Sequence, residues 1–281
     1  MDNEELRRDP LTGVRSVHPD QRNKPFPVAR RTLPHQPGPC VFCALAAAPV
    51  DDHGDIKNGD ELSHLEWNGE YTFAITNRWR PFGQASGADL VILRRHATSV
   101  EEMSDAEIGE FFGALVERRS RQSEEYARTL AYVNVGLEVN GTQPHLHGQI
   151  VGTNVESRGP VAPALTRESL DADSALARDH GVTLDIVRGT HVYVAWAPTT
   201  TGEVRVVADD AMTLGLGVRE VLTKMTAAFG ELSYNVVVLT GPQLVAQVLP
   251  RFTAVGVLPP YFGLAVVMIP PEDVARSLRD A

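Results

Sequence analysis

Long apolar runs are absent from this sequence of 281 residues. No stretch approaches the roughly 20 consecutive apolar residues that a membrane-spanning helix requires. The first residues, Met1 to Glu5, lack the basic and apolar regions of a signal peptide. We therefore expect a cytoplasmic protein with no membrane partner.

Positive charge is also scarce, because acidic residues outnumber basic ones and the formal net charge is −10. Neutralising many backbone phosphates takes clustered Lys and Arg, so a broad nucleic-acid-binding surface is not expected. A small phosphorylated ligand is still compatible, since it needs only a local group of backbone N–H donors and a few side chains.

Cysteine is limited to two residues, Cys40 and Cys43, which form a Cys-x-x-Cys pair. In a reducing compartment this spacing indicates a metal site or a redox pair rather than a structural disulfide. A zinc site needs about four ligands, so two more would have to be histidines. Nine histidines are available, and spacing alone favours only His145 or His147; the others are His18, His35, His53, His64, His96, His180 and His191.

Local patterns predict a mixture of strands and helices. Residues 71–77 and 88–93 have the character of strands, and Ser104 to Glu107 fits the capping box of a helix that follows. Residues 130–139 form a β-branched run, which a short turn at 140–142 connects to a strand carrying the histidines. The first 35 residues or so are expected to have little regular structure.

The same order of elements returns after residue 188, which indicates an internal duplication. Residues 130–132 match 232–234, and residues 144–150 match 242–248, but the second copy has lost both histidines. We expect an α+β protein with a catalytic repeat at 1–155, a linker at 156–188 containing a short helix from Arg167 onward, and a degenerate second repeat at 189–281.

The histidine strand carries the most specific chemical signal. Alternate residues of a strand share a face, so His145, His147 and Gln149 are expected to project together. A neutral imidazole attacks phosphorus if its other nitrogen donates to a fixed acceptor. Neutral donors suit the charge that develops on the phosphate oxygens, and the candidates are Asn134, Thr142, Gln149 and the backbone near Gly141.

With these motifs, the sequence resembles the galactose-1-phosphate uridylyltransferases and their ADP-sugar phosphorylase relatives in the histidine-triad superfamily. The resemblance covers nearly the whole chain, and its most specific element is His-x-His-Gly-Gln downstream of Cys-x-x-Cys. The segments that carry it are residues 7–13, 40–43, 76–77, 134–136, 145–149, 249–253 and 269–272.

The resemblance implies two histidine-triad-like repeats, each an antiparallel sheet with packed helices, and a homodimer. It makes His147 the nucleophile that carries the nucleotide, with Gln149 beside it. The family's structural zinc ligands correspond to Cys40, Cys43, His96 and His145. Its phosphate-contacting residues correspond to Asn77, Asn134, Thr142 and Gln149, and its nucleobase-packing residues to Val41, Phe42 and Phe73.

Several positions depart from the family pattern. Because Val245 and Gln247 stand where the family's second metal site has histidines, no iron is expected. Val257 and Leu258 replace the aromatic and acidic residues that hold the sugar hydroxyls, and Arg78 replaces an acidic residue after Asn77. The family's phosphate-binding arginines fall near Gln21, Arg22 and Lys24, in an ambiguous register.

The leading hypothesis is a nucleotidyltransferase of carbohydrate metabolism, galactose metabolism by the family's example. It would move a nucleoside monophosphate from a nucleotide sugar to a sugar 1-phosphate through a nucleotidyl-histidine. The alternatives are a nucleotide-sugar phosphorylase or hydrolase, and a non-catalytic, zinc-stabilised nucleotide-binding protein.

Overall fold

The computed structural model describes residues 5–18, 31–34, 38–58, 61–78, 80–82, 86–155, 165–252 and 264–281. The helices are α1 (Val41–Ala47), α2 (Asp105–Glu125), α3 (Arg167–Asp179), α4 (Ala211–Phe229) and α6 (Pro271–Asp280), with short 3-10 turns at Val100–Glu102 and Leu137–Val139. None of the helices in these ranges is long and apolar enough to cross a membrane.

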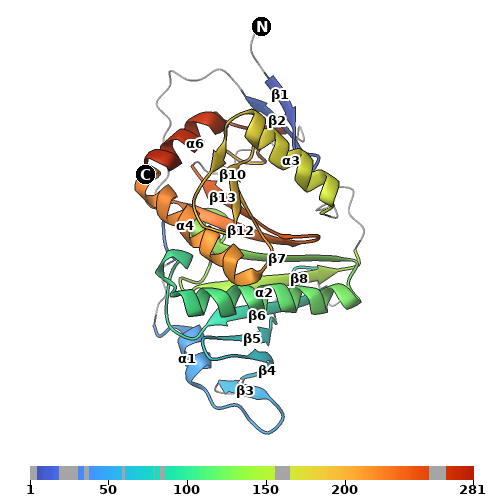
Figure 1. Ribbon diagram of the computed structural model, residues 1–281. Helices are drawn as coiled ribbons and strands as arrows, with labels where there is room; N and C mark the ends of the chain where they lie inside the picture. The colour runs from blue at the N-terminus through green and yellow to red at the C-terminus, as the bar shows by residue number, and fades with distance from the viewer. Residues whose placement is uncertain are drawn as a thin grey trace.

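One large antiparallel sheet dominates the molecule (Figure 1). Its eleven strands follow the order β3-β4-β5-β6-β8-β7-β12-β13-β11-β10-β9. Their bounds are β3 Asp55–Asn58, β4 Glu61–Asn68, β5 Thr72–Thr76, β6 Ser86–Leu93, β7 Arg128–Val135, β8 His147–Thr153, β9 Thr183–Leu184, β10 His191–Val194, β11 Val204–Ala208, β12 Ser233–Thr240 and β13 Leu244–Arg251. The expected antiparallel sheet with packed helices is thus confirmed, but β7 and β12 join the two halves of the chain into a single sheet.

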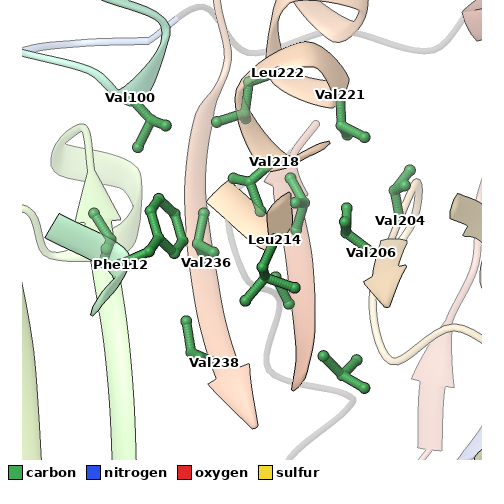
Figure 2. Packing of buried hydrophobic residues seen from close by; sticks show 14 of the residues in the cluster. Val100, Phe112, Val204, Val206, Leu214, Val218, Val221, Leu222, Val236 and Val238 are labelled. Atoms are coloured by element: carbon green, nitrogen blue, oxygen red, sulfur yellow. The ribbon is translucent and has the colours of Figure 1, made fainter. Parts of the chain in front are cut away.

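Helices α2 and α4 contact each other and cover one face of the sheet (Figure 1). Ser104 and Glu107 form the predicted capping box at the start of α2. Figure 2 shows Leu214 and Val218 of α4 packed among valines of β11 and β12, such as Val206 and Val236, which are fully buried. This apolar layer fixes which residues of each strand face the helices, and their neighbours in sequence therefore face the opposite side.

The N-terminal region is more regular than expected. Strands β1 (Glu5–Arg8) and β2 (Arg15–His18) form a hairpin, and β14 (Leu264–Val266) pairs with β2 in parallel. The Asp9 carboxylate stabilises the connecting turn, because it accepts hydrogen bonds from the backbone N–H groups of Leu11 (3.0 Å) and Thr12 (3.2 Å). The prediction of little regular structure is therefore wrong for residues 5–18, where a side-chain cap organises a turn-rich sequence.

Strand β7 ends earlier than predicted, at Val135. Gly136 has a positive φ of 98°, and residues 137–139 form a 3-10 turn before Asn140 adopts a left-handed conformation (φ 60°). Strand β8 begins at His147, so His145 lies just before the strand rather than within it. Within the predicted linker, helix α3 begins at Arg167 as expected, and residues 156–164 lie outside the described part.

The strand register corrects the two sequence matches between the halves. In an alignment of the two repeats, these matches make Ala131 equivalent to Ser233 and Ile150 equivalent to Val248. Ala131 pairs with Ile150 in the sheet, so a strict repeat would pair Ser233 with Val248. Instead Val248 pairs with Val236, which shows that the two matches cannot both hold.

Candidate functional site

Four side chains gather where the N-terminus of α1 meets the loops that follow β6 and precede β8. The ligand atoms of Cys40, Cys43, His96 and His145 all lie within 4.8 Å of one another. His145 Nδ1 is 3.3 Å from Cys40 Sγ and 3.5 Å from Cys43 Sγ, and His96 Nδ1 is 3.4 Å from Cys43 Sγ. Tetrahedral zinc bonds of about 2.3 Å to sulfur and 2.0 Å to nitrogen place such atoms about 3.5 Å apart, so this Cys2His2 group fits a metal ion.

The far side of the His145 ring is also held. Its Nε2 lies 2.6 Å from the carbonyl oxygen of Leu93, which can only accept, so Nε2 carries the proton and Nδ1 is free to bind a metal. Burial lowers the pKa of His145 to about 4 and therefore keeps the ring neutral. Burial and the adjacent Cys40 thiol raise the pKa of Cys43, an effect that a bound cation would oppose.

His147 is the first residue of β8 and has 6% of its surface exposed. It pairs with Ile92, which in turn pairs with Phe73, so the three side chains share the face opposite α2. Its Nδ1 lies 2.9 Å from the carbonyl oxygen of His145. Because that oxygen can only accept, Nδ1 must donate, and Nε2 keeps its lone pair. Burial lowers the pKa of His147, which also favours the neutral ring.

Gly148 lies on the other face and lets the helix approach β8. A Cβ atom there would lie 2.4 Å from Leu115 Cδ2 on α2. The pair His147-Gly148 therefore combines a reactive side chain on one face with close helix packing on the other.

Gln149 follows on the same face as His147 and is half-buried. The hydroxyl of Tyr132, on the neighbouring strand β7, donates to Gln149 Oε1 at 3.0 Å. With its oxygen occupied, the side-chain amide of Gln149 is oriented to donate. Burial raises the pKa of Tyr132, so the hydroxyl stays protonated and remains a donor.

Asn134 lies two residues beyond Tyr132 on β7, on the same face. The side-chain amide of Asn235, from β12, donates to Asn134 Oδ1 at 2.6 Å, and Arg251 Nη2 donates to Asn235 Oδ1 at 2.7 Å. Both asparagine oxygens are thereby occupied, which leaves the Asn134 amide as a donor. The second half of the chain thus orients a candidate site residue of the first half.

The other predicted site residues lie around this group. Phe42 packs edge-on to both His145 and His147, at ring-centre distances of 5.7 and 5.0 Å. Phe73 is fully buried in the same cluster, whereas Val41 is exposed. Asn77 directly follows β5, and Thr142 is exposed in the loop before the histidines.

The remaining predicted positions lie away from this group or outside the described residues. Gln21, Arg22, Lys24, Val257 and Leu258 lie outside the described residues. Arg78 is exposed next to Asn77. In the second half, Val245 is buried, and Gln247 Nε2 donates to Glu203 at 3.0 Å.

Three functional candidates were missed from the sequence, namely Tyr132, Asn235 and Arg251. Tyr132 and Asn134 occupy alternate positions of one strand, so a period of two would have placed Tyr132 with Asn134. Asn235 reaches Asn134 only because β12 pairs with the distant strand β7, and Arg251 then contacts Asn235 within the β12–β13 hairpin, so no local pattern relates either residue to the site.

Comparison with protein-family models gave no match, and neither did a search of curated proteins. Solved structures do match. An ADP-glucose phosphorylase from Arabidopsis thaliana, determined with bound ADP-glucose, has a TM-score of 0.70 at 16% identity over 99% of both chains. A galT-like protein from Arabidopsis thaliana has a TM-score of 0.69 at 17% identity, over 100% of this chain and 99% of that one. A uridylyltransferase structure has a TM-score of 0.61 at 16% identity, over 98% of this chain and 97% of that one. The chain therefore has the fold shared by these uridylyltransferase-like and ADP-glucose phosphorylase structures.

Proposed function

We propose that this protein is a nucleotidyltransferase in which His147 Nε2 attacks the α-phosphate of a nucleotide sugar. The observation that carries the proposal is the hydrogen bond from His147 Nδ1 to the carbonyl oxygen of His145. It fixes the tautomer in which Nε2 is unprotonated, which is the form that a phosphorus nucleophile requires.

The first half of the reaction forms the bond between Nε2 and the α-phosphorus and breaks the bond to the bridging oxygen. The departing sugar phosphate takes the electron pair and needs no proton. In the second half, another phosphate attacks and regenerates the neutral imidazole. The amides of Gln149 and Asn134 are placed to donate to the non-bridging oxygens, where charge gathers in the transition state.

The identity of the acceptor distinguishes the candidate reactions. A sugar 1-phosphate makes the protein a transferase, and inorganic phosphate makes it a phosphorylase. The structural likeness to both a uridylyltransferase and an ADP-glucose phosphorylase supports this pair of reactions. Gln149 binds oxygens without acting as a base toward water, so hydrolysis is disfavoured.

The four-ligand site supports a structural role for zinc. Two thiolates and two imidazoles match the preference of Zn²⁺, and a closed set of four leaves no open position for substrate. Phe42, Phe73, Asn77 and Thr142 complete the proposed nucleotide-binding region. By the family's example, the active form is a homodimer.

The mirrored strand order supports the two-repeat interpretation. Outward from the β7–β12 junction, the order β8-β6-β5 corresponds to β13-β11-β10. We therefore propose a catalytic repeat at 1–155 and a second repeat at 189–281, with 156–188 between them.

The proposed function is tested by incubating the protein with labelled UDP-glucose or ADP-glucose and measuring the intact mass. A nucleoside monophosphate adduct is expected on His147. Adding glucose 1-phosphate, galactose 1-phosphate or inorganic phosphate should then discharge it and identify the acceptor.

His147→Asn should abolish the adduct, and His64→Asn, which changes an exposed histidine, should not. If neither nucleotide sugar labels the unaltered protein, the enzyme proposal fails. Nucleotide binding without labelling would instead favour the non-catalytic binder.

A further inference from the structure

The face of the sheet opposite α2 and α4 carries a strip of polar side chains at its middle. Continuing the β7–β8 register past Val133 and Gly148 places Asn134 beside His147, and Asn134 pairs with Asn235. Alternation along β13 places Arg251 on this same face, two residues beyond Leu249, the partner of Asn235. Asn134, Asn235 and Arg251 are all half-buried, so this part of the strip is partly exposed.

The guanidinium of Arg251 lies on this strip without a carboxylate partner among the described residues. Its Nε is buried without a hydrogen-bond partner, and Nη2 bonds only a neutral amide oxygen. Within the described ranges no carboxylate forms a salt bridge with it, whereas Arg118 and Arg205 each bind two or three carboxylates. Burial alone lowers its pKa. A partly desolvated guanidinium without an anion is costly, which indicates that an anion completes the site.

The position of Arg251 indicates that the anion is a second phosphate, next to a phosphate bound at His147. Neighbouring strands lie about 4.8 Å apart, and Arg251 is three strands from His147 but extends one strand back to Asn235. A phosphate bound at His147 and Asn134 would therefore have its next phosphate directed along the strip toward the guanidinium. The planar fork of Arg suits two phosphate oxygens.

We propose that Arg251 binds the second phosphate of a nucleoside diphosphate substrate, the one that departs on the sugar. This inference rests on the proposed function, because it takes His147 to mark the position of the α-phosphate. As the bridging bond breaks, the departing phosphate gains a negative charge, and Arg251 neutralises it across the junction between the two halves.

The test compares nucleoside monophosphates with diphosphates by calorimetry, using AMP, UMP, ADP and UDP. The unaltered protein should bind the diphosphate of at least one base more tightly than its monophosphate. Arg251→Gln should weaken diphosphate binding about tenfold or more and monophosphate binding by less than about twofold. Arg251→Lys keeps the charge but loses the fork, so an intermediate loss is expected.

Arg119→Gln is the matched control. Arg119 is likewise lowered in pKa by burial alone and bonds a neutral oxygen, that of Thr240, but it projects from α2 on the opposite side of the sheet. The Arg119→Gln substitution should leave the ratio of diphosphate to monophosphate affinity unchanged. Circular dichroism confirms that each variant folds, and Arg251→Lys decides the question if Arg251→Gln does not fold.

Two results would overturn this inference and leave the proposed function intact. Equal losses for mono- and diphosphates would mean that Arg251 only positions Asn134, and unchanged affinities would mean that it binds no phosphate. If the unaltered protein binds none of the four nucleotides, the proposed function itself fails, and that result appears before any variant is made.

Discussion

At the scale of single residues, hydrogen bonds to neighbouring groups determine which polar atoms of the candidate site remain free to bind a ligand. Carbonyl oxygens occupy one nitrogen of His145 and one of His147, and the Tyr132 hydroxyl occupies the oxygen of Gln149. Each of these hydrogen bonds selects one tautomer or amide orientation. The nitrogen of the proposed nucleophile and the Gln149 amide are thus oriented before any ligand binds.

Replacing Tyr132 with Phe tests this orientation. The change removes one hydrogen bond and leaves the ring, so the free energy of unfolding should change little, while the Gln149 amide is free to rotate. We expect the rate of His147 labelling in a single turnover to fall about three- to tenfold. Tyr126→Phe, on the α2 face, should not slow labelling, and an unchanged rate in Tyr132→Phe would exclude an orienting role.

At the scale of elements, the candidate metal site brings α1 together with the loops next to the paired strands β6 and β8. Cys40 and Cys43 come from the start of α1, His96 from the loop after β6, and His145 from the loop before β8. Since the carbonyl of His145 also holds His147, the metal site and the proposed nucleophile share one stretch of backbone.

Metal removal is expected to loosen this junction. Extended dialysis against a chelator should lower the Tm by roughly 10 °C or more, and zinc should restore it. Metal analysis of the untreated protein should give one zinc per chain. Cys43→Ser should reproduce the loss, and His53→Ser, which alters an exposed histidine, should not; a metal-free protein with an unchanged Tm would argue against a structural ion.

The elements also show which features the sequence could predict. Helix α2 was predicted because Ser104 and Glu107 form its cap within four residues. The Cys-x-x-Cys and His-x-His motifs are equally local, and the resemblance identified His96. The continuous sheet and the contact between Asn134 and Asn235 depend on pairing between β7 and β12, about a hundred residues apart, and no local pattern records such a pairing.

At the scale of the whole molecule, Arg205 connects distant parts of the chain. Its guanidinium is fully buried and lies 2.9 Å from Asp9 in the N-terminal turn, 2.6 Å from Asp173 in α3 and 2.8 Å from Glu203. Burial would lower the pKa of Arg205, but the three carboxylates raise it well above its usual value. The group therefore remains charged and holds these three segments together.

Arg205→Met should be strongly destabilising because it leaves three buried carboxylates without a cation. We expect a loss of about 3–5 kcal/mol in the free energy of unfolding at neutral pH. Buried carboxylates without a partner favour the protonated form, so the loss should shrink as the pH falls toward roughly 5. Urea unfolding at both pH values measures it.

Arg276→Met, in an exposed pair with Asp273, serves as the control and should change stability by no more than about 0.5 kcal/mol. A loss for Arg205→Met that is the same at both pH values would show that packing, rather than charge, is what Arg205 contributes.

The pairing of β7 with β12 constrains which substitutions this chain can accept in evolution. His145 and His147 lie on one side of this junction, and Asn235 donates to Asn134 from the other side, with Arg251 bound to Asn235 behind it. The second half, which lacks a pair like His145 and His147, is therefore constrained at Asn235 and Arg251, because these residues orient the candidate site residue Asn134 of the first half. Substitutions at Asn134 and Asn235 are therefore expected to be coupled, because one side-chain hydrogen bond joins the two residues across the junction.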